Sequence, residues 1–210
     1  MIGALRNQEI LINVHCYDVH DLESVIRVSK EFGFKITAVH HAAEAHLIPE
    51  VISKNNITVV GFLDNIGERT ETLWSSVKAP SVLTEAGVAF ALESDHPVTH
   101  ARDLIFQAGK ANYYGLDAGY AIDAVTRVPA KTIGLGHRIG TIKAGYDADI
   151  VAWDRYPLLL GASPSHVFID GEMHVDSKLA NRPEIPAGNK APFTIKGSCS
   201  QNIPVTKYAI

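Results

Sequence analysis

The chain has 210 residues, of which 46% are hydrophobic and 20% charged, and its formal net charge is −4. This composition is typical of a globular protein with a sizeable core, and it offers no basic surface for nucleic acid. No apolar run approaches the roughly 20 residues that a membrane-spanning helix needs, which excludes a membrane protein of that kind.

The first half of the chain alternates short apolar runs with stretches of helical spacing. Four runs are partly β-branched and predict buried strands: 10–14, 34–39, 57–62 and 87–92. Helices are predicted between them: 22–32, 44–54 and 80–86. We expect Asp21 to cap the first helix and Gly33 to end it. The alternation predicts an α/β fold with a parallel sheet and right-handed crossovers.

The second half changes from helices to glycine-punctuated β structure. Three helices are predicted first: 99–111, 117–126 and a short one with Pro129 in its first turn. From Gly134 onward, alternation predicts antiparallel strands within 139–153 and 167–175, with a hairpin turn at Asp170-Gly171. The proline-containing remainder has little periodicity, and we expect it to be extended.

The two cysteines, Cys16 and Cys199, lie far apart in the sequence and form no disulfide framework. The N-terminal MIGALRNQEI lacks the charged-then-apolar layout of a secretion signal. These features indicate a reducing compartment, so we expect a cytoplasmic protein.

Histidines are concentrated near the predicted strand ends. Seven of the ten lie in the first half of the chain, and His15, His41 and Asp95 each follow an apolar run. The carboxyl ends of parallel strands are where ligands bind, so these three side chains are expected to converge there. For any single histidine, an ordinary hydrogen bond is a more common explanation than a metal. The clustering is what favours a metal.

Five segments carry a resemblance to a known family. They are, in order, NVHC at 13–16, VHHAAEAHLI at 39–48, ALESDHPV at 91–98, RVPAKTIGLGHRIGTIKAGYDADIVAWDRYPL at 127–158 and VFIDGEMHV at 167–175. Together they make the chain resemble the C-terminal portion of the amidohydrolase superfamily, on the branch near imidazolonepropionase. The fourth segment is the most specific, because in that family it marks the return of the chain from the barrel to a small β-sandwich.

The resemblance implies a partial (β/α)8 TIM-type barrel, with about strands five to eight, and part of a small β-sandwich. It divides the chain into the C-terminal half of a metal-dependent hydrolase barrel, a sandwich portion and an extended tail: 1–134, 135–176 and 177–210.

The resemblance also implies roles for single residues. His15, His41 and Asp95 would hold a divalent metal, most often zinc, and Asp95 would also be catalytic as the proton shuttle. His40 competes with its neighbour His41 for the ligand position. His96 is a weaker expectation as a substrate-binding neighbour, and we interpret His46 as a packing or surface residue.

The implied reaction is hydrolysis of a non-peptide carbon–nitrogen bond in a small-molecule substrate, by attack of metal-bound hydroxide. The sequence departs from the family pattern at one point that matters for this reaction. It lacks the His-x-His pair that follows the first strand in the family. Only nine residues precede the first predicted strand. We therefore expect a truncated form with little activity alone, completed by a homo-oligomer or by a missing N-terminal half.

Two rival interpretations stay open. The chain could be a non-catalytic member that acts as a fragment or subunit. It could also belong to an unrelated barrel that binds phosphorylated sugars, although no glycine-rich turn opens a helix after a strand. Glycosidase chemistry is not favoured, because Glu93 and Asp95 are two positions apart and do not form a facing pair.

Overall fold

The structure is a computed structural model that describes residues 9–176 and the backbone of residues 208–209. The chain divides into two compact units, residues 1–146 and 147–210. Every helix in the described ranges is too short or too polar to cross a lipid bilayer. The division predicted at residue 134 stays a prediction, and most of the predicted tail lies outside the described residues.

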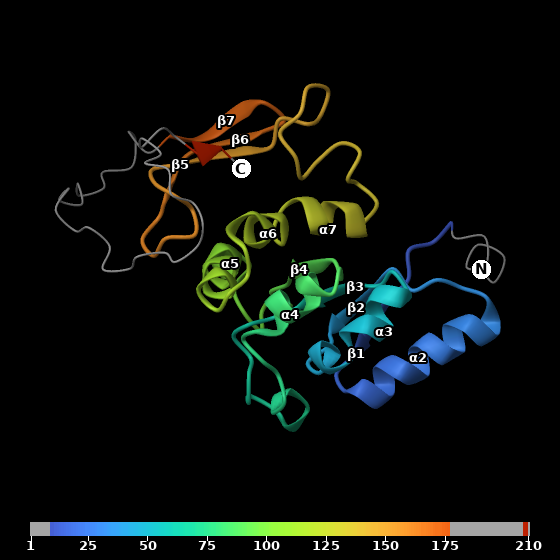
Figure 1. The fold of residues 1–210 in the computed structure, drawn as a ribbon. Coiled ribbons are helices and arrows are strands. Elements are labelled where there is room, and N and C mark those ends of the chain that lie inside the picture. Colours follow the sequence, from blue (N-terminus) through green and yellow to red (C-terminus); the bar gives the residue numbers. More distant parts are fainter. Residues whose placement is uncertain (1–8, 177–207, 210) are drawn as a thin grey trace. The chain divides into compact units, whose positions relative to one another are not determined.

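The first unit is built on a four-stranded parallel sheet with strands in chain order (Figure 1). Its strands are β1 (Asn13–Cys16), β2 (Ala38–His41), β3 (Thr58–Gly61) and β4 (Phe90–Leu92). The register places His15 opposite His40 and Cys16 opposite His41. The predicted parallel α/β architecture is confirmed, although each strand pairs over fewer residues than its apolar run. β1 includes His15 instead of ending before it.

Three helices follow the first three strands: α2 (Val19–Phe32), α3 (Pro49–Lys54) and α4 (Ala79–Glu85). The cap of α2 is Asp18 and not the predicted Asp21, because the Asp18 side chain accepts the Asp21 N–H at 2.9 Å. Gly33 ends α2 with φ 69°, as predicted. The predicted helix 44–54 is broken into a 3-10 turn at Ala45–Leu47 and α3, which begins at Pro49.

Three more helices complete the first unit: α5 (Leu104–Tyr113), α6 (Ala118–Asp123) and α7 (Arg127–Thr132). Figure 1 shows α6 and α7 on the opposite side of the sheet from α2 and α3. Val128 of α7 packs against a buried cluster of Ala38, Val60 and Ala91, one residue from each of β2, β3 and β4. The two alanines leave room for the helix to approach the sheet closely.

The second unit is an antiparallel sheet of order β7-β6-β5-β8. Its strands are β5 (Ile150–Trp153), β6 (Pro164–Ile169), β7 (Glu172–Asp176) and β8 (Tyr208–Ala209). The predicted β unit and its hairpin are confirmed, and Asp170 and Gly171 turn the chain with φ 51° and 82°. Within the range 139–153, where strands were predicted, only β5 forms, over the last four residues. Positive φ at Gly140 (82°) and Gly145 (87°) turns the chain before β5.

Candidate functional site

Two histidine side chains meet at the carboxyl edge of the parallel sheet. Nδ1 of His15, on β1, lies 2.9 Å from Nε2 of His41, the last residue of β2. Two nitrogens bound to one tetrahedral zinc at ~2.0–2.1 Å would be roughly 3.3 Å apart. The pair therefore has the geometry of a hydrogen bond between a donor and an acceptor nitrogen. A small adjustment would let both lone pairs face one cation.

The backbone at His41 has an unusual conformation. It has φ 63°, and the next residue, Ala42, has φ 42°. The Ala42 N–H donates to the carbonyls of His40 and Cys16, each at 2.8 Å. The bond to His40 spans the single residue His41, whose φ is positive, and this is the pattern of the rare γ-turn. Such conformations cost about 1–3 kcal/mol each and cluster at functional sites.

The imidazole of His41 stacks between two aromatic side chains. The Tyr17 ring lies 4.8 Å away at an interplanar angle of 9°, and the Phe62 ring lies 5.4 Å away at 16°. The His41 side chain is only 6% exposed. The plane of its ring is therefore fixed by packing on both faces.

Glu93 contacts both histidines of β2, which the sequence analysis did not predict. It is the first residue after β4, and its Oε2 lies 2.8 Å from His40 Nδ1. Its Oε1 accepts the backbone N–H of His41 at 3.0 Å. The same Oε1 lies 3.0 Å from His41 Nδ1, within ion-pair distance but without hydrogen-bond alignment. The available signal was its position two residues from both Ala91 and Asp95, on the same strand face.

His40 makes different contacts from its neighbour His41. Its Nε2 lies 3.2 Å from Oδ1 of Asn13, and its ring stacks on His15 with centroids 4.8 Å apart at 14°. A chain of contacts thus runs from Glu93 through His40 to Asn13 and crosses from β4 to β1. His41, not His40, presents a ring nitrogen to His15.

Asp95 lies in the turn after β4, with φ 45°, and its carbonyl accepts the Val98 N–H at 2.9 Å. Within residues 9–176, no three His, Cys, Asp or Glu side chains are grouped so as to hold a metal ion. The structure therefore brings together two of the three predicted ligands, His15 and His41. Imidazole nitrogens are ligands that zinc takes, and the metal role of all three residues stays a prediction.

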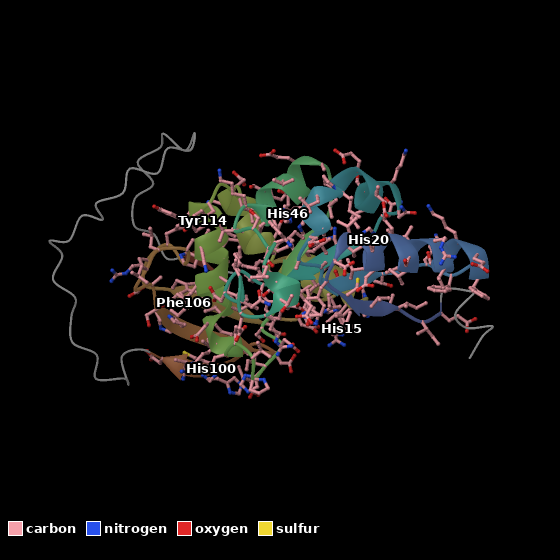
Figure 2. The ribbon with its side chains drawn as sticks, turned by 90° about the horizontal axis from the view of Figure 1, so that it is seen from below. His15, His20, His46, His100, Phe106 and Tyr114 are labelled. Carbon is pink, nitrogen blue, oxygen red and sulfur yellow. The ribbon has the colours of Figure 1, made fainter. Side chains whose placement is uncertain are left out.

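Other histidines lie on segments around this edge. Figure 2 labels His15 on β1 and His20 at the start of α2, whereas His100 belongs to the turn before α5. His96 precedes Pro97, and its ring centroid lies 6.0 Å from that of His100. His46 is in the 3-10 turn before α3, and burial lowers its pKa below the ordinary value.

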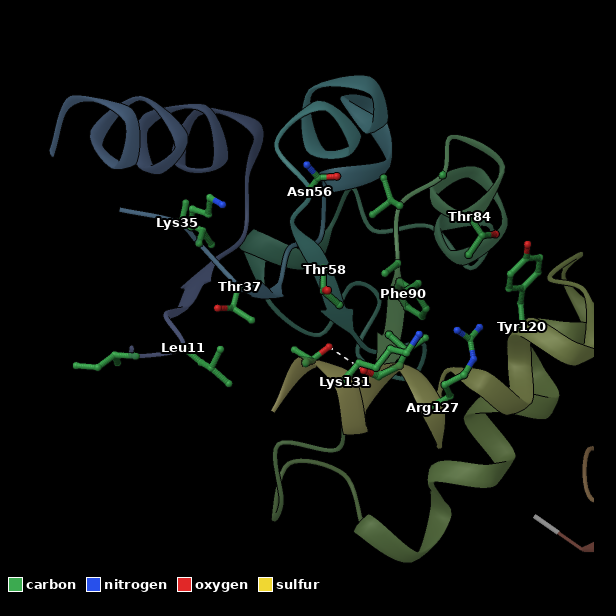
Figure 3. Close-up of a pocket in the computed structure, with 17 residues that line it drawn as sticks. Leu11, Lys35, Thr37, Asn56, Thr58, Thr84, Phe90, Tyr120, Arg127 and Lys131 are labelled. Atoms are coloured by element: carbon green, nitrogen blue, oxygen red, sulfur yellow. Dashed lines mark hydrogen bonds between the residues drawn. The ribbon is translucent and has the colours of Figure 1, made fainter. Parts of the chain in front are cut away.

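A cavity of about 580 Å³ lies at the other end of the strands (Figure 3). Residues at or before the strand starts line it, such as Thr37, Thr58 and Ala89, together with Lys131 and Arg127 of α7. The histidine pair lies at the carboxyl ends of the same strands. The cavity and the histidine pair are therefore separate features, at opposite ends of the sheet.

Comparison with known proteins places these features in a family. The family model described as "Amidohydrolase family" matches residues 3–181. The amidohydrolase tasK of Hapsidospora irregularis is 40% identical over 179 residues, which are 83% of this chain and 18% of that protein.

Solved structures show the same relationship. An amidohydrolase from Thermotoga maritima is 31% identical with a TM-score of 0.77, over 83% of this chain and 45% of that one. An adenosine deaminase from Xanthomonas campestris with bound zinc has a TM-score of 0.64 at 18% identity, a likeness of fold, and 47% of it is covered. The chain thus spans about half the length of these structures and less than a fifth of the curated relative.

Proposed function

The chain belongs to the amidohydrolase family, and we propose that it contributes to hydrolysis of a non-peptide carbon–nitrogen bond in a small molecule. The observation that carries the proposal is the 2.9 Å approach of His15 Nδ1 to His41 Nε2 at the carboxyl edge of a parallel sheet. Within the family, the segment 127–158 favours a place near imidazolonepropionase.

We propose that these two nitrogens hold a divalent cation, with zinc as the first candidate. Imidazole nitrogens suit zinc, and the stacking of His41 between Tyr17 and Phe62 pre-orients one of them. When bound, the ion would supply a Lewis acid that lowers the pKa of water and polarises a carbonyl group. The protein's part is to fix the ring directions and to limit access of solvent to the His41 side.

Asp95 is the proposed proton carrier. It would accept a proton from the attacking water and deliver that proton to the leaving nitrogen, as a general base and then a general acid. Its place two residues after Glu93, whose carboxylate contacts both His40 and His41, supports this role. His96, the next residue, is proposed as a neighbour of the substrate.

We propose further that β1 to β4 correspond to about strands five to eight of a (β/α)8 barrel. β1 and β4 are the two edges of the described sheet and do not pair with each other. Ile10 and Leu11, which precede β1, are 42% and 46% exposed. An open edge flanked by apolar side chains favours association, so the remaining ligands would come from further strands, in a second copy or in an N-terminal half.

A hydrolysis screen tests this function. The 210-residue chain is assayed with zinc on amides, lactams and esters, alone and mixed with a separately expressed N-terminal half of a related barrel. We expect little turnover alone and clear turnover in the mixture. Asp95→Asn should abolish that turnover, whereas Asp103→Asn, an exposed carboxylate in the same unit, should not. Turnover that persists in Asp95→Asn, or none in any combination, would contradict the proposal.

A further inference from the structure

We propose that Glu93 is a positioning residue, whose carboxylate sets the directions of the His15 and His41 rings without itself binding the metal. The inference rests on the proposed function for its purpose, namely the metal site. Its structural content, a carboxylate that fixes two imidazoles, stands on contacts already described.

The first step is the reach of Glu93 across the sheet. Glu93 follows β4, and the histidines that it contacts are on β2, with β3 between the two strands. Its own backbone N–H bonds the Gly61 carbonyl of β3 at 3.1 Å. Backbone and side chain of this one residue therefore tie the carboxyl ends of three strands together.

The second step is the backbone of His41. Oε1 of Glu93 accepts the His41 N–H at 3.0 Å, at the residue whose φ is 63°. A donor held by a carboxylate makes a stronger hydrogen bond than one held by a neutral group. Glu93 thereby holds the turn that directs the His41 ring toward His15.

The third step leads to the His15 ring through His40. Oε2 of Glu93 lies 2.8 Å from His40 Nδ1, and an ionised carboxylate only accepts, so this nitrogen is the donor. The bond fixes the plane of the His40 ring, which stacks on His15 at 4.8 Å and 14°. One carboxylate thus restrains one ring through the backbone and the other through a stacked neighbour.

Both carboxylate oxygens of Glu93 take part in this arrangement. Its side chain is 10% exposed, and its two oxygens accept from two separate donors. A glutamine would offer one acceptor oxygen and one amide group that donates, so it could not accept from the His41 N–H and from a protonated His40 Nδ1 at the same time. Glu93→Gln therefore preserves volume while removing half of the restraint.

Glu44 provides a matched control. Its Oε2 also accepts a backbone N–H after a strand end, that of Val19, at 3.0 Å. Glu44→Gln keeps an acceptor for that single donor. The two variants thus compare a carboxylate that contacts the two β2 histidines with one that accepts the N–H at a helix start.

The deciding measurement uses the metal-free chain. Two-bond ¹H–¹⁵N spectra of labelled histidine rings report the tautomer and surroundings of His15 and His41 near neutral pH. We expect Glu93→Gln to move both sets of ring signals toward those of an exposed imidazole, and Glu44→Gln to leave them in place. Unchanged His15 and His41 signals in Glu93→Gln, or equal changes in both variants, would overturn the proposal. Because no metal is present, this result does not depend on the proposed function.

A second measurement uses cobalt(II) as the probe. Titration of the wild-type chain, followed by calorimetry and visible absorption, gives affinity and ligand geometry. Loss of a group that orients a metal ligand costs roughly 10–100-fold in affinity, and we expect that loss in Glu93→Gln but not in Glu44→Gln. Cobalt affinity of Glu93→Gln equal to that of the wild type would overturn the positioning role. Failure of the wild type itself to bind cobalt would contradict the proposed function, with the spectra still deciding on Glu93.

Discussion

Nδ1 of His15 and Nε2 of His41 lie 2.9 Å apart, although 26 positions separate the two residues in the sequence. Parallel pairing of β1 with β2 brings their carboxyl ends together. The positive φ of His41 and its two aromatic neighbours then direct its ring toward His15. The relationship therefore depends on strand register, on one strained turn and on ring packing, each of which a substitution can test.

Glu93 should make the stability of the chain depend on acid pH. Burial by itself would raise the pKa of the Glu93 carboxyl, but hydrogen bonds and charge from His40 and His41 reverse this, and the pKa is lowered from its ordinary value of 4.5. A lowered folded pKa gives stability that is fully present above the unfolded value and is lost as pH falls through the folded value.

We therefore expect Glu93→Gln to lower the free energy of unfolding by about 2 kcal/mol at pH 7. The difference from the wild type should shrink below the ordinary pKa of 4.5. Urea unfolding of both chains across this pH range measures it. A difference that is constant with pH would show that the charge of Glu93 contributes nothing.

Cys16 should react slowly with thiol reagents. It is 6% exposed, and burial, with smaller effects of Asp21 and Asp18, raises the pKa of its thiol from 9.0 to about 11. Because the thiolate is the nucleophile, a rise of this size lowers the reactive fraction on the order of a hundredfold. Iodoacetamide labelling at pH 8, quantified on the Cys16 peptide, should be far slower in the native chain than in urea. Equal rates would contradict the buried placement of this residue.

Gly33 should tolerate substitution only at a conformational cost. Its φ is 69°, and a Cβ placed there would meet no atom within 4 Å, so the cost is one of backbone conformation alone. We expect Gly33→Ala to lower the free energy of unfolding by roughly 1 kcal/mol. Gly33→Asn should cost less, because asparagine adopts this conformation more readily. Equal costs of the two substitutions, measured by urea unfolding, would show that conformation is not the cause.

The parallel sheet could be predicted because apolar runs alternate with helical stretches in the sequence. This alternation can be recognised without knowledge of tertiary contacts. Strand starts were less predictable. Ile36 is 5% exposed and apolar, yet it precedes β2, because burial does not require ladder pairing. Asp18 lies three positions before the predicted cap Asp21, and only the bond between them identifies Asp18 as the cap.

The candidate site was predictable in part for a similar reason. His15 and His41 could be predicted because each follows an apolar run. The contacts of Glu93 with β2 could not be predicted, because they depend on the register of three strands. The choice between His40 and His41 depends on the φ of one residue, which no composition or spacing reveals.

The most direct test of the central claim is the zinc content of the 210-residue chain after equilibration with zinc and removal of the excess, measured by elemental analysis. Bound zinc is expected in the wild type. His15→Ala and His41→Ala should each lower the affinity of the chain for zinc at least about tenfold, because each removes one ligand. His20→Ala, an exposed histidine close in sequence to His15, should leave the zinc content unchanged. A wild-type chain that retains no zinc, or His15→Ala and His41→Ala variants that retain as much as the wild type, would contradict the account.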